Sequence, residues 1–472
     1  MTRQVIVIKD LGHGDSGKGT MVDAYAGMTD AHTVVRDNGG AQALHYVMTN
    51  DGRVHGFAQF GSATFRPRVR THLSRFMLVS PTHMLEEERQ LHTLGVTDAF
   101  ARLTIDREAP VITLYHRLAN WLRELARGAH QHGSCGMGIA ETMQDLLANH
   151  EDVLRVGDLQ DAVSVARKMR WLRLRKREEL ASVIAALPDP THPWAVKALK
   201  ALSSDQALAS FLENTKRLVR QVKIVDGDYL GRLLAETGTV IFEGAQGVLL
   251  DEWYGFHPHT TWSTTTFENA DTLLAEQGYG DRVIKIGVLR AYATRHGAGP
   301  LVTYDPELMM ALPEAHNHNS GWQGWFRVGW FDLVAARYAL DVVGKIDGLA
   351  ITNLDRVAHL PEMRLCDAYR YTPVNDDLET FHRYFGFSFG AEPGMRLSRI
   401  VVDRSRNLDR QAEVTRRVLT CQPEYRMVRQ KAYLSSIVAS LGVPIAATSR
   451  GQKAADKHFL MTDFLSPRES VR

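Results

Sequence analysis

The chain is poor in cysteine, in net charge and in long apolar segments. Its 472 residues include three cysteines, an odd number without a CxxC pair, which predicts a reducing compartment and any metal site built from oxygen ligands. Lysine and arginine number 56 against 54 acidic residues, so the formal charge of +2 gives no global attraction to nucleic acid or anionic membranes. No apolar run approaches the roughly 18 residues that span a membrane, and no leader pattern begins the chain. We therefore expect a cytoplasmic protein.

Short apolar runs alternate along the chain with segments of helical spacing. The runs lie at 5–8, 33–35, 240–242, 283–289, 349–352 and 443–447. Helical spacing is clearest over 111–127. This alternation predicts an α/β fold with a mostly parallel, doubly wound sheet. Because no repeat or low-complexity linker divides the sequence, we expect one large domain over residues 1–472.

The stretch from about 158 to 226 has helical spacing throughout and predicts a helical insertion. Its cations are Arg167, Lys168, Arg170, Arg173, Arg175, Lys176 and Arg177. We interpret them as a solvated helical face, because no aromatic side chains alternate with them to stack on bases. A patch for RNA or DNA is the less favoured alternative.

Residues 5–20, VIVIKDLGHGDSGKGT, carry the strongest chemical signal. An apolar run leads into a glycine-rich loop before an expected helix at 21–27, so main-chain N–H groups and the helix N-terminus can face phosphate oxygens. Gly12, Gly17 and Lys18 fit the Walker pattern, but Gly19 stands where a metal-binding hydroxyl should be. Asp15 is the obvious replacement ligand, since Mg²⁺ prefers one or two carboxylates plus phosphate oxygens.

The same loop is compatible with two other interpretations. Gly12, Gly14 and Gly17 also fit the dinucleotide fingerprint, with Asp37 where a ribose-binding acid would be expected. A plain glycine turn between strand and helix is the third possibility. Lys18 favours the phosphate-transfer interpretation over both.

A colinear series of motifs narrows the choice. The motifs are VVRDNGGAQALHYV, HGSCGMGIAETM, RVGDL, FEGAQGVLLDEWYGFHP, GVLRAYATRHGAGP, RVGWFD, ITNLD and TSRGQ. Their order and approximate spacing resemble those of adenylosuccinate synthetases over nearly the whole chain. The opening loop resembles the family's GDEGKGK, and FEGAQG with the following LLD matches almost letter for letter.

The resemblance implies a Mg²⁺-dependent ligase of purine metabolism that forms C–N bonds. GTP, as co-substrate, would phosphorylate the 6-oxo group of inosine monophosphate (IMP), and the amine of aspartate would then displace the phosphate. A homodimer is also implied. Asp15 would take the N1 proton of the base and bind Mg²⁺, His45 would stabilise charge on the transferring phosphate, and Gln246 would hold the 6-oxygen region. Leu44, in place of a glycine, would offer Mg²⁺ its main-chain carbonyl.

For the nucleotide, the resemblance places guanine recognition at Asp355. Asn353 replaces the lysine that stacks over the base in the family's TKLD pattern, so we expect a weakened guanine preference. The implied GTP-binding residues are Gly14, Gly17, Lys18, Gly19, Thr20, Asn353, Asp355, Ser449 and Gly451.

The departures from the family concentrate on its substrates. Cys135 stands where a threonine holds the 5′-phosphate of IMP, and Glu151 with Asp152 replaces a basic run that should help to hold it. Thr261 keeps its place and Gln42 lengthens an asparagine, so part of that pocket persists. A purine-like substrate without the usual 5′-phosphate is therefore an open alternative to IMP.

The aspartate-binding block RRRRTGWLD becomes GWFRVGWFD at 324–332, which keeps only Arg327. Guanidinium groups are the standard partners of carboxylates, so aspartate should bind poorly. We expect a less acidic, more apolar amine, accepted with the help of Trp322, Trp325 and Phe326. The alternative is that Arg295 and Arg327 recover aspartate binding from a shifted loop.

Two further possibilities concern the whole chain. Asp15 argues against the variant branch that acts on dGMP, in which a small residue replaces this aspartate. A catalytically inactive GTP-binding regulator is the alternative from another functional class. Joint retention of Asp15, Lys18, His45 and Gln246 favours an enzyme, because drift should have altered these residues as much as the substrate pocket.

Overall fold

The computed structural model describes residues 3–128, 131–148, 153–314, 323–372, 381–389 and 394–462. Glu151, Asp152 and Trp322 lie outside these ranges. The chain divides into two compact units. Unit one comprises residues 1–5, 30–245 and 269–281, and unit two comprises 6–29, 246–268 and 282–472.

The largest sheet is mostly parallel. Its strands are β1 (Arg3–Asp10), β2 (Ala31–Arg36), β5 (Arg70–Leu73), β6 (Leu103–Asp106), β7 (Lys223–Val225), β8 (Gly238–Gly247), β9 (Arg282–Arg290), β13 (Gly348–Thr352), β18 (Ile445–Ser449) and β19 (Lys457–Phe459). They form a ten-stranded sheet in the order β19-β18-β13-β9-β1-β8-β2-β5-β6-β7. Pairs on either side of β2, β6 and β13 are parallel, whereas β18 and β19 are antiparallel. The predicted α/β class with a mostly parallel sheet is confirmed.

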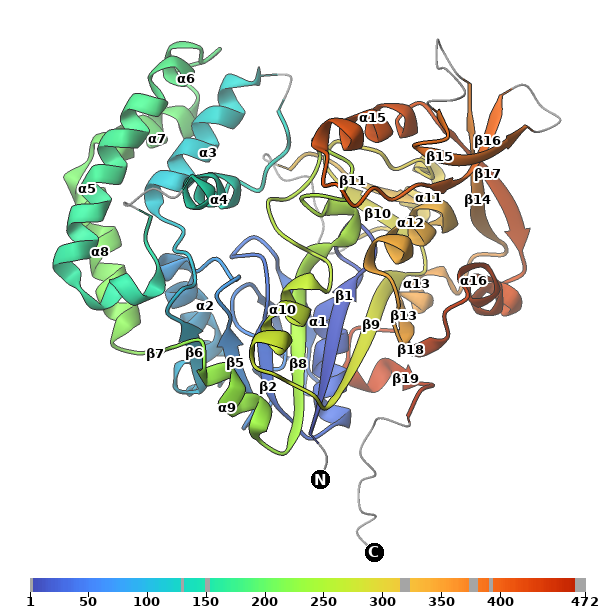
Figure 1. Ribbon diagram of the computed structural model, residues 1–472, viewed down its shortest axis with the longest axis horizontal. Coiled ribbons are helices and arrows are strands. Elements are labelled where there is room, and N and C mark those ends of the chain that lie inside the picture. The colour runs from blue at the N-terminus through green and yellow to red at the C-terminus, as the bar shows by residue number, and fades with distance from the viewer. Residues whose placement is uncertain are drawn as a thin grey trace, which may run out of the picture. The chain divides into compact units, whose positions relative to one another are not determined.

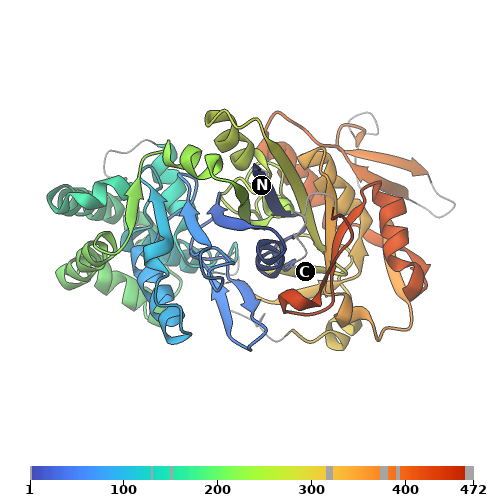
Figure 2. The same ribbon diagram turned by 90° about the horizontal axis from the view of Figure 1, so that it is seen from below.

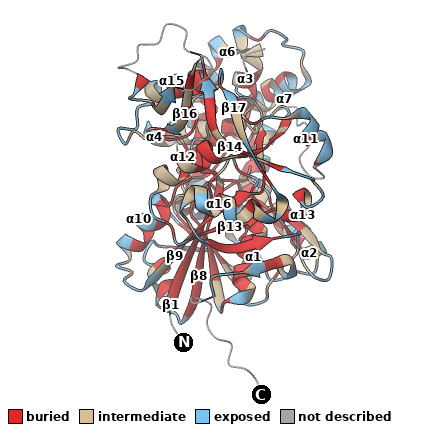
Figure 3. Ribbon diagram, turned by 90° about the vertical axis from the view of Figure 1, so that its right-hand side faces the viewer, coloured by how far each residue is buried: buried red, intermediate tan, exposed pale blue. Residues whose placement is uncertain are grey.

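Each predicted apolar run contributes to a strand of this sheet. Their side chains are largely buried, as Figure 3 shows for β1, β8, β9 and β13. Strands that carry apolar residues on both faces in this way are typical of parallel sheets covered by helices. The last run was predicted to begin at 443, but β18 begins at Ile445, after Pro444.

Unit one contains nine α-helices in the part of the chain that the structure describes. They are α2 (Pro81–Thr93), α3 (Leu114–Ala126), α4 (Ile139–Leu147), α5 (Ala162–Glu179), α6 (Ala181–Ala185), α7 (Pro193–Ser203), α8 (Asp205–Val219), α9 (Tyr229–Ala235) and α10 (Glu268–Glu276). Figure 1 shows α3, α5, α6, α7 and α8 gathered in one group. The stretch 158–226 was predicted to be helical throughout. It contains α5 to α8, but Lys223–Val225 instead forms β7, because Ile224 and Val225 pair with β6.

Many cations of α5 are neutralised within unit one. Lys168 pairs with Asp158 at 2.9 Å and Arg173 pairs with Asp205 at 2.6 Å. Three donors converge on Asp145 of α4: Arg175 at 2.9 Å, Lys176 at 2.8 Å and the Nε2 of His116 at 3.1 Å. This buried cluster fastens α3, α4 and α5 together. Arg167, Arg170 and Arg177 remain exposed.

Unit two combines its share of the large sheet with a second, mainly antiparallel sheet. Its remaining elements are α1 (Lys18–Met28), β10 (Ala293–His296), α11 (Pro306–Ala311), β11 (Phe326–Gly329), β12 (Phe331–Asp332), α12 (Leu333–Val343), α13 (Leu354–Val357), β14 (Met363–Tyr371), β15 (Phe385–Phe389), β16 (Met395–Ile400), α15 (Leu408–Val418), β17 (Gln422–Val428) and α16 (Tyr433–Leu441). The second sheet follows the order β12-β14-β16-β15, and β17 also pairs with β14. No apolar run predicted these strands, because polar residues interrupt them.

Two helices differ from their expected limits. The helix expected at 21–27 begins at Lys18, directly after Gly17, so the glycine loop leads straight into its first turn. In Figure 2 this helix is seen nearly end-on in dark blue, near the red β18–β19 hairpin, and Tyr25 packs on Phe459 with ring centroids 4.8 Å apart. The spacing at 111–127 yields α3 only from Leu114, because Thr113 caps it. Within the described residues, no helix is both long and apolar enough to cross a membrane.

Candidate active site

A buried carboxylate organises the glycine loop. Asp10 is the last residue of β1, and its side chain accepts hydrogen bonds from the Gly12 N–H at 2.7 Å and the Ser16 N–H at 3.0 Å. The ammonium of Lys18, whose side chain is 3% exposed, donates to Asp10 at 3.1 Å and to the Gln246 carbonyl at 2.7 Å. The amides of Gly12 and Ser16 are thus engaged within the loop. Asp10 was not predicted, although an acid between a buried strand and a glycine loop was the available signal.

Three of the five described non-glycine residues with positive φ are predicted site residues, the other two being Arg68 and Arg406. Asp15 (φ 57°), Gln246 (φ 54°) and Asn353 (φ 58°) all adopt the left-handed conformation that disfavours side chains. Such residues cost about 1–3 kcal/mol each and persist where the surroundings impose them. One such constraint is visible beside Gln246, since a Cβ at Gly247 would lie 2.3 Å from the Gly12 carbonyl. The loop and residue 247 therefore touch main chain to main chain.

Asp15 presents an ionised carboxylate that is 36% exposed. Its Oδ2 lies 3.3 Å from Nε2 of His296, and its main-chain carbonyl accepts from Arg290 at 3.4 Å. Burial alone would raise the pKa of Asp15, but His296, Arg290 and Lys18 more than offset it, so the pKa is lowered. A lowered pKa keeps the carboxylate ionised, the form that both a metal ligand and a proton acceptor require.

His45, in the hairpin strand β3 (His45–Met48) that pairs with β4 (Val54–Phe57), is held by a buried glutamate of unit one. Its Nδ1 lies 2.5 Å from Oε1 of Glu243, and Ser62 donates to the same carboxylate through its N–H, at 2.9 Å, and its hydroxyl. Burial raises the pKa of Glu243, but Arg36, His45 and Ser62 outweigh it and lower the pKa to about 2. An ionised Glu243 orients the ring and selects the proton on Nδ1. Glu243 was missed, although it is the glutamate of FEGAQG.

Unit two also brings together most residues predicted for the nucleotide. The Thr20 hydroxyl donates to the Gln452 carbonyl at 2.9 Å, and the Ser449 hydroxyl donates to the Gly451 carbonyl at 3.0 Å. The Thr352 hydroxyl, next to Asn353, donates to the Ser16 carbonyl at 2.7 Å. These bonds connect the glycine loop with the ends of β13 and β18.

A lysine that was not predicted lies in the same part of unit two as Asp355, an exposed residue of α13. Lys457 donates to the carbonyls of Gly451 at 2.8 Å and Lys453 at 2.9 Å. Burial lowers the pKa of Lys457 to about 8, against the opposing effect of Asp456, Asp23 and Asp355. No motif indicated Lys457, and only the alternation of side chains along β19 could have done so.

The predicted substrate and metal residues of unit one differ in their surroundings. Cys135 packs against Ile112 and Ile139, and burial raises its thiol pKa to about 11, so it offers no charge to a phosphate. Both amide atoms of Gln42 are buried and have no hydrogen-bond partner in the described part of the chain. The Leu44 side chain is exposed. In unit two, the Thr261 N–H donates to the Leu250 carbonyl at 2.8 Å.

The two arginines considered for aspartate hold main-chain carbonyls instead. Arg295 is 2% exposed and donates to the carbonyls of Ala298 and His259, both at 2.9 Å. Nη2 of Arg327 donates to the carbonyls of Gly297 at 2.6 Å and Gly299 at 2.8 Å. Both guanidinium groups therefore stabilise the turn after β10.

The two described aromatic residues proposed for the amine differ in exposure. Trp325 is 69% exposed, whereas Phe326 is buried and packs on His296 with ring centroids 4.7 Å apart. Trp325 lies directly before β11, which begins at Phe326. Their contact with an amine stays a prediction.

A magnesium site fits the donors present, although they are few. Among the described residues no group of three or more His, Cys, Asp or Glu side chains could hold a metal ion. Mg²⁺ needs only one or two carboxylates when substrate phosphates supply other ligands. The partly exposed, ionised carboxylate of Asp15 satisfies that requirement.

Comparisons with known proteins agree on one family. The family described as adenylosuccinate synthetase matches residues 7–457. An adenylosuccinate synthetase of Vibrio parahaemolyticus is 31% identical over 375 residues, which cover 77% of this chain and 80% of that protein. Among solved structures, fully ligated adenylosuccinate synthetase from Plasmodium falciparum aligns with a TM-score of 0.73 at 18% identity, covering 97% of this chain and 100% of the other.

A second solved structure has the same fold at greater distance. Succinoaminodeoxyadenylate synthetase of cyanophage S-2L, bound to dGMP and to dATP as an energy donor, aligns with a TM-score of 0.57 at 15% identity. The alignment covers 97% of this chain and 96% of the phage protein. At such identities the two structures establish a shared fold.

Proposed function

Because the chain belongs to the adenylosuccinate synthetase family, whose members are ligases that form C–N bonds, we propose that it uses GTP to phosphorylate the 6-oxo group of IMP or a related purine. An amine then displaces the phosphate. The observation that carries this proposal is the position of Asp15. Its φ of 57° is strained, His296 contacts its side chain and Arg290 contacts its main chain, and its ionised carboxylate remains partly exposed. An inactive regulator would have no use for that strain.

Each catalytic side chain then has a distinct task. Asp15 accepts the N1 proton of the purine, which makes the 6-oxygen nucleophilic. His45, with its Nδ1 held by Glu243, directs Nε2 toward charge that develops on the transferring phosphoryl group. Gln246 offers an amide with both donor and acceptor atoms to the base, and its Oε1 is buried without a partner among the described residues.

The nucleotide is held mainly by main chain. Lys18 and the loop amides other than those of Gly12 and Ser16 contact the β and γ phosphates, while Asp355 accepts two hydrogens from guanine. The full proposed set is Gly14, Gly17, Lys18, Gly19, Thr20, Asn353, Asp355, Ser449 and Gly451. Mg²⁺, when bound, supplies charge neutralisation at the phosphates, with Asp15 and the Leu44 carbonyl as its proposed protein ligands.

The purine substrate is proposed to contact Gln42 and Thr261, while Cys135 contributes an apolar wall rather than a charge. The acceptor amine differs from aspartate, because Arg295 and Arg327 are engaged with the carbonyls of the turn at 297–300. A homodimer is proposed by analogy with the family.

The test is a product screen of the purified protein. It is incubated with GTP, Mg²⁺, a panel of purine nucleosides and nucleotides, and mixed primary amines, and the products are identified by mass spectrometry. A 6-amino-substituted purine formed together with GDP and phosphate is expected. Steady-state kinetics with IMP, GTP and aspartate then decide the amine: a millimolar or better KM for aspartate with ordinary turnover would contradict our assignment of the amine.

A further inference from the structure

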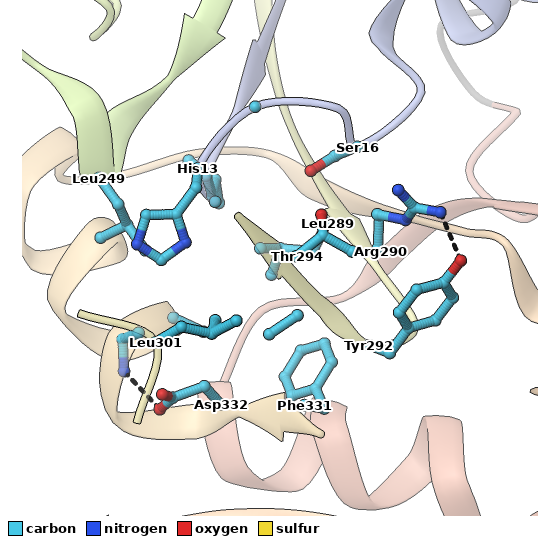
Figure 4. Close-up of a pocket in the computed structure, with 16 residues that line it drawn as sticks. His13, Ser16, Leu249, Leu289, Arg290, Tyr292, Thr294, Leu301, Phe331 and Asp332 are labelled. Carbon is cyan, nitrogen blue, oxygen red and sulfur yellow. Dashed lines mark hydrogen bonds between the residues drawn. The ribbon is translucent and has the colours of Figure 1, made fainter. Parts of the chain in front are cut away.

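An apolar pocket lies in unit two beneath the glycine loop (Figure 4). Its lining includes Leu249, Leu289, Leu301 and Phe331, and two small residues of α12, Ala335 and Ala336. His13 and Thr294 line it as well, and in Figure 4 the His13 ring extends over the space above Leu301. The motifs of the sequence gave no indication of this pocket.

Arg290 and Asp332, two charged side chains that line the pocket, already have partners. Arg290, the only cation among the described lining residues, pairs with Glu314 at 2.5 Å. Asp332 accepts from the Ala335 N–H at 2.9 Å and the Tyr369 hydroxyl at 2.6 Å. An anionic substituent would therefore contact no unpaired cation among the described lining residues.

The position of the pocket relates it to the proposed reaction. Gly14 and Ser16, the neighbours of Asp15 on both sides, line it. Thr294 also lines it, and lies two residues before His296, whose Nε2 contacts the Asp15 carboxylate. Residues two apart on a strand face the same side, so the wall of the pocket continues toward the carboxylate that activates the purine.

We propose that this pocket receives the uncharged, apolar substituent of the amine that displaces the phosphate. The substrate class is a primary amine with an aliphatic or aromatic side group, and the assignment rests on the proposed ligase function. The amine nitrogen forms a bond to C6 of the purine while the C6–O bond breaks. Phosphate leaves with that electron pair, and the nitrogen releases a proton to water.

A homologous series of straight-chain primary amines tests the proposal, with IMP, GTP and Mg²⁺ held constant. Each buried methylene should raise kcat/KM by about fourfold until the pocket is full. Ala336→Leu should narrow the pocket and lower kcat/KM for long amines by about tenfold or more, with little effect on methylamine. Leu301→Ala should shift the optimum toward longer amines.

The two variants should shift the preferred amine length in opposite directions. Damage to the fold would instead lower kcat/KM for all amines equally, so the two causes can be distinguished. Leu174→Ala, at an exposed position of α5, is the matched control and should leave the whole series unchanged. The pocket assignment would be overturned if kcat/KM did not change along the amine series. It would also be overturned if the variants changed kcat/KM for every amine by the same factor. Aspartate as the best substrate, unaffected by either variant, would leave the ligase intact and refute only this inference. If no amine gives a product, both the proposed ligase function and the pocket assignment are refuted.

Discussion

Two parts of unit two differ in the ionised groups that they leave exposed. In the glycine loop, Lys18 contacts the Asp10 side chain and the Gln246 carbonyl, and the Asp15 carboxylate remains partly exposed. In the turn after β10, Arg295 and Arg327 are directed to main-chain carbonyls, and a mostly apolar pocket lies nearby. The loop therefore keeps an ionised group for chemistry, whereas the turn uses its ionised groups for shape. The presence of arginine in a motif does not by itself give a carboxylate site.

The largest expected effect tests the loop. Asp15→Ala should lower turnover by at least about three decades, since a general base and a metal contact are lost together. Single-turnover GTP consumption with purine and Mg²⁺ measures the chemical step directly. Asp30→Ala, a surface carboxylate in unit one, serves as the control. If Asp15→Ala keeps its turnover, the loop does not hold an ionised group for chemistry, and the contrast with the turn after β10 is lost.

Loss of the Glu243 contact that orients His45 should lower kcat almost as much. Glu243→Gln keeps the size of the side chain but removes the charge that orients the ring, and we expect a loss of about two decades in kcat. His45→Ala should cost a similar factor and leave GTP affinity nearly unchanged, because the ring acts on developing charge. Calorimetric GTP titrations of both variants check this. A large loss of affinity would instead assign His45 to ground-state binding.

Nucleotide choice provides a smaller effect. Asp355→Asn should narrow the ratio of kcat/KM for GTP over ATP by about one to two decades, the scale of a charge-assisted contact worth about 1.5–3 kcal/mol. Competition between the two nucleotides in one assay gives the ratio directly. Equal use of GTP and ATP by the unmodified protein would show that this residue does not read the base.

The smallest effect tests the turn. Arg327→Gln removes hydrogen bonds to the Gly297 and Gly299 carbonyls and should lower the free energy of unfolding by about 1–2 kcal/mol. Its KM for aspartate should stay as poor as before. Urea denaturation and amine kinetics on the same preparation provide both values, with Arg89→Gln at an exposed site of α2 as control. A marked rise in the aspartate KM would show that Arg327 binds substrate after all.

The sequence predicted the large sheet well because its strands are continuous apolar runs, and it located Asp15 and Lys18 because glycine spacing is local. It could not predict Glu243 as an organising residue, since its donors His45 and Ser62 are distant in the sequence. The donors to Asp10 come from the glycine loop itself, so the local pattern contained that signal. A motif comparison also could not distinguish Trp325 from Phe326, of which only Phe326 is buried, because it treats the two residues as one block.

The left-handed backbone at Asp15 sets stability and activity against each other. Glycine adopts a φ of 57° without steric cost, so Asp15→Gly should relieve about 1 kcal/mol of strain while it deletes the carboxylate. A screen that rewards abundance or heat resistance would then favour a variant that a growth selection for the product would eliminate. Position 15 would receive opposite scores from the two screens, a signature by which deep mutational data could recognise the reaction centre without a substrate in hand.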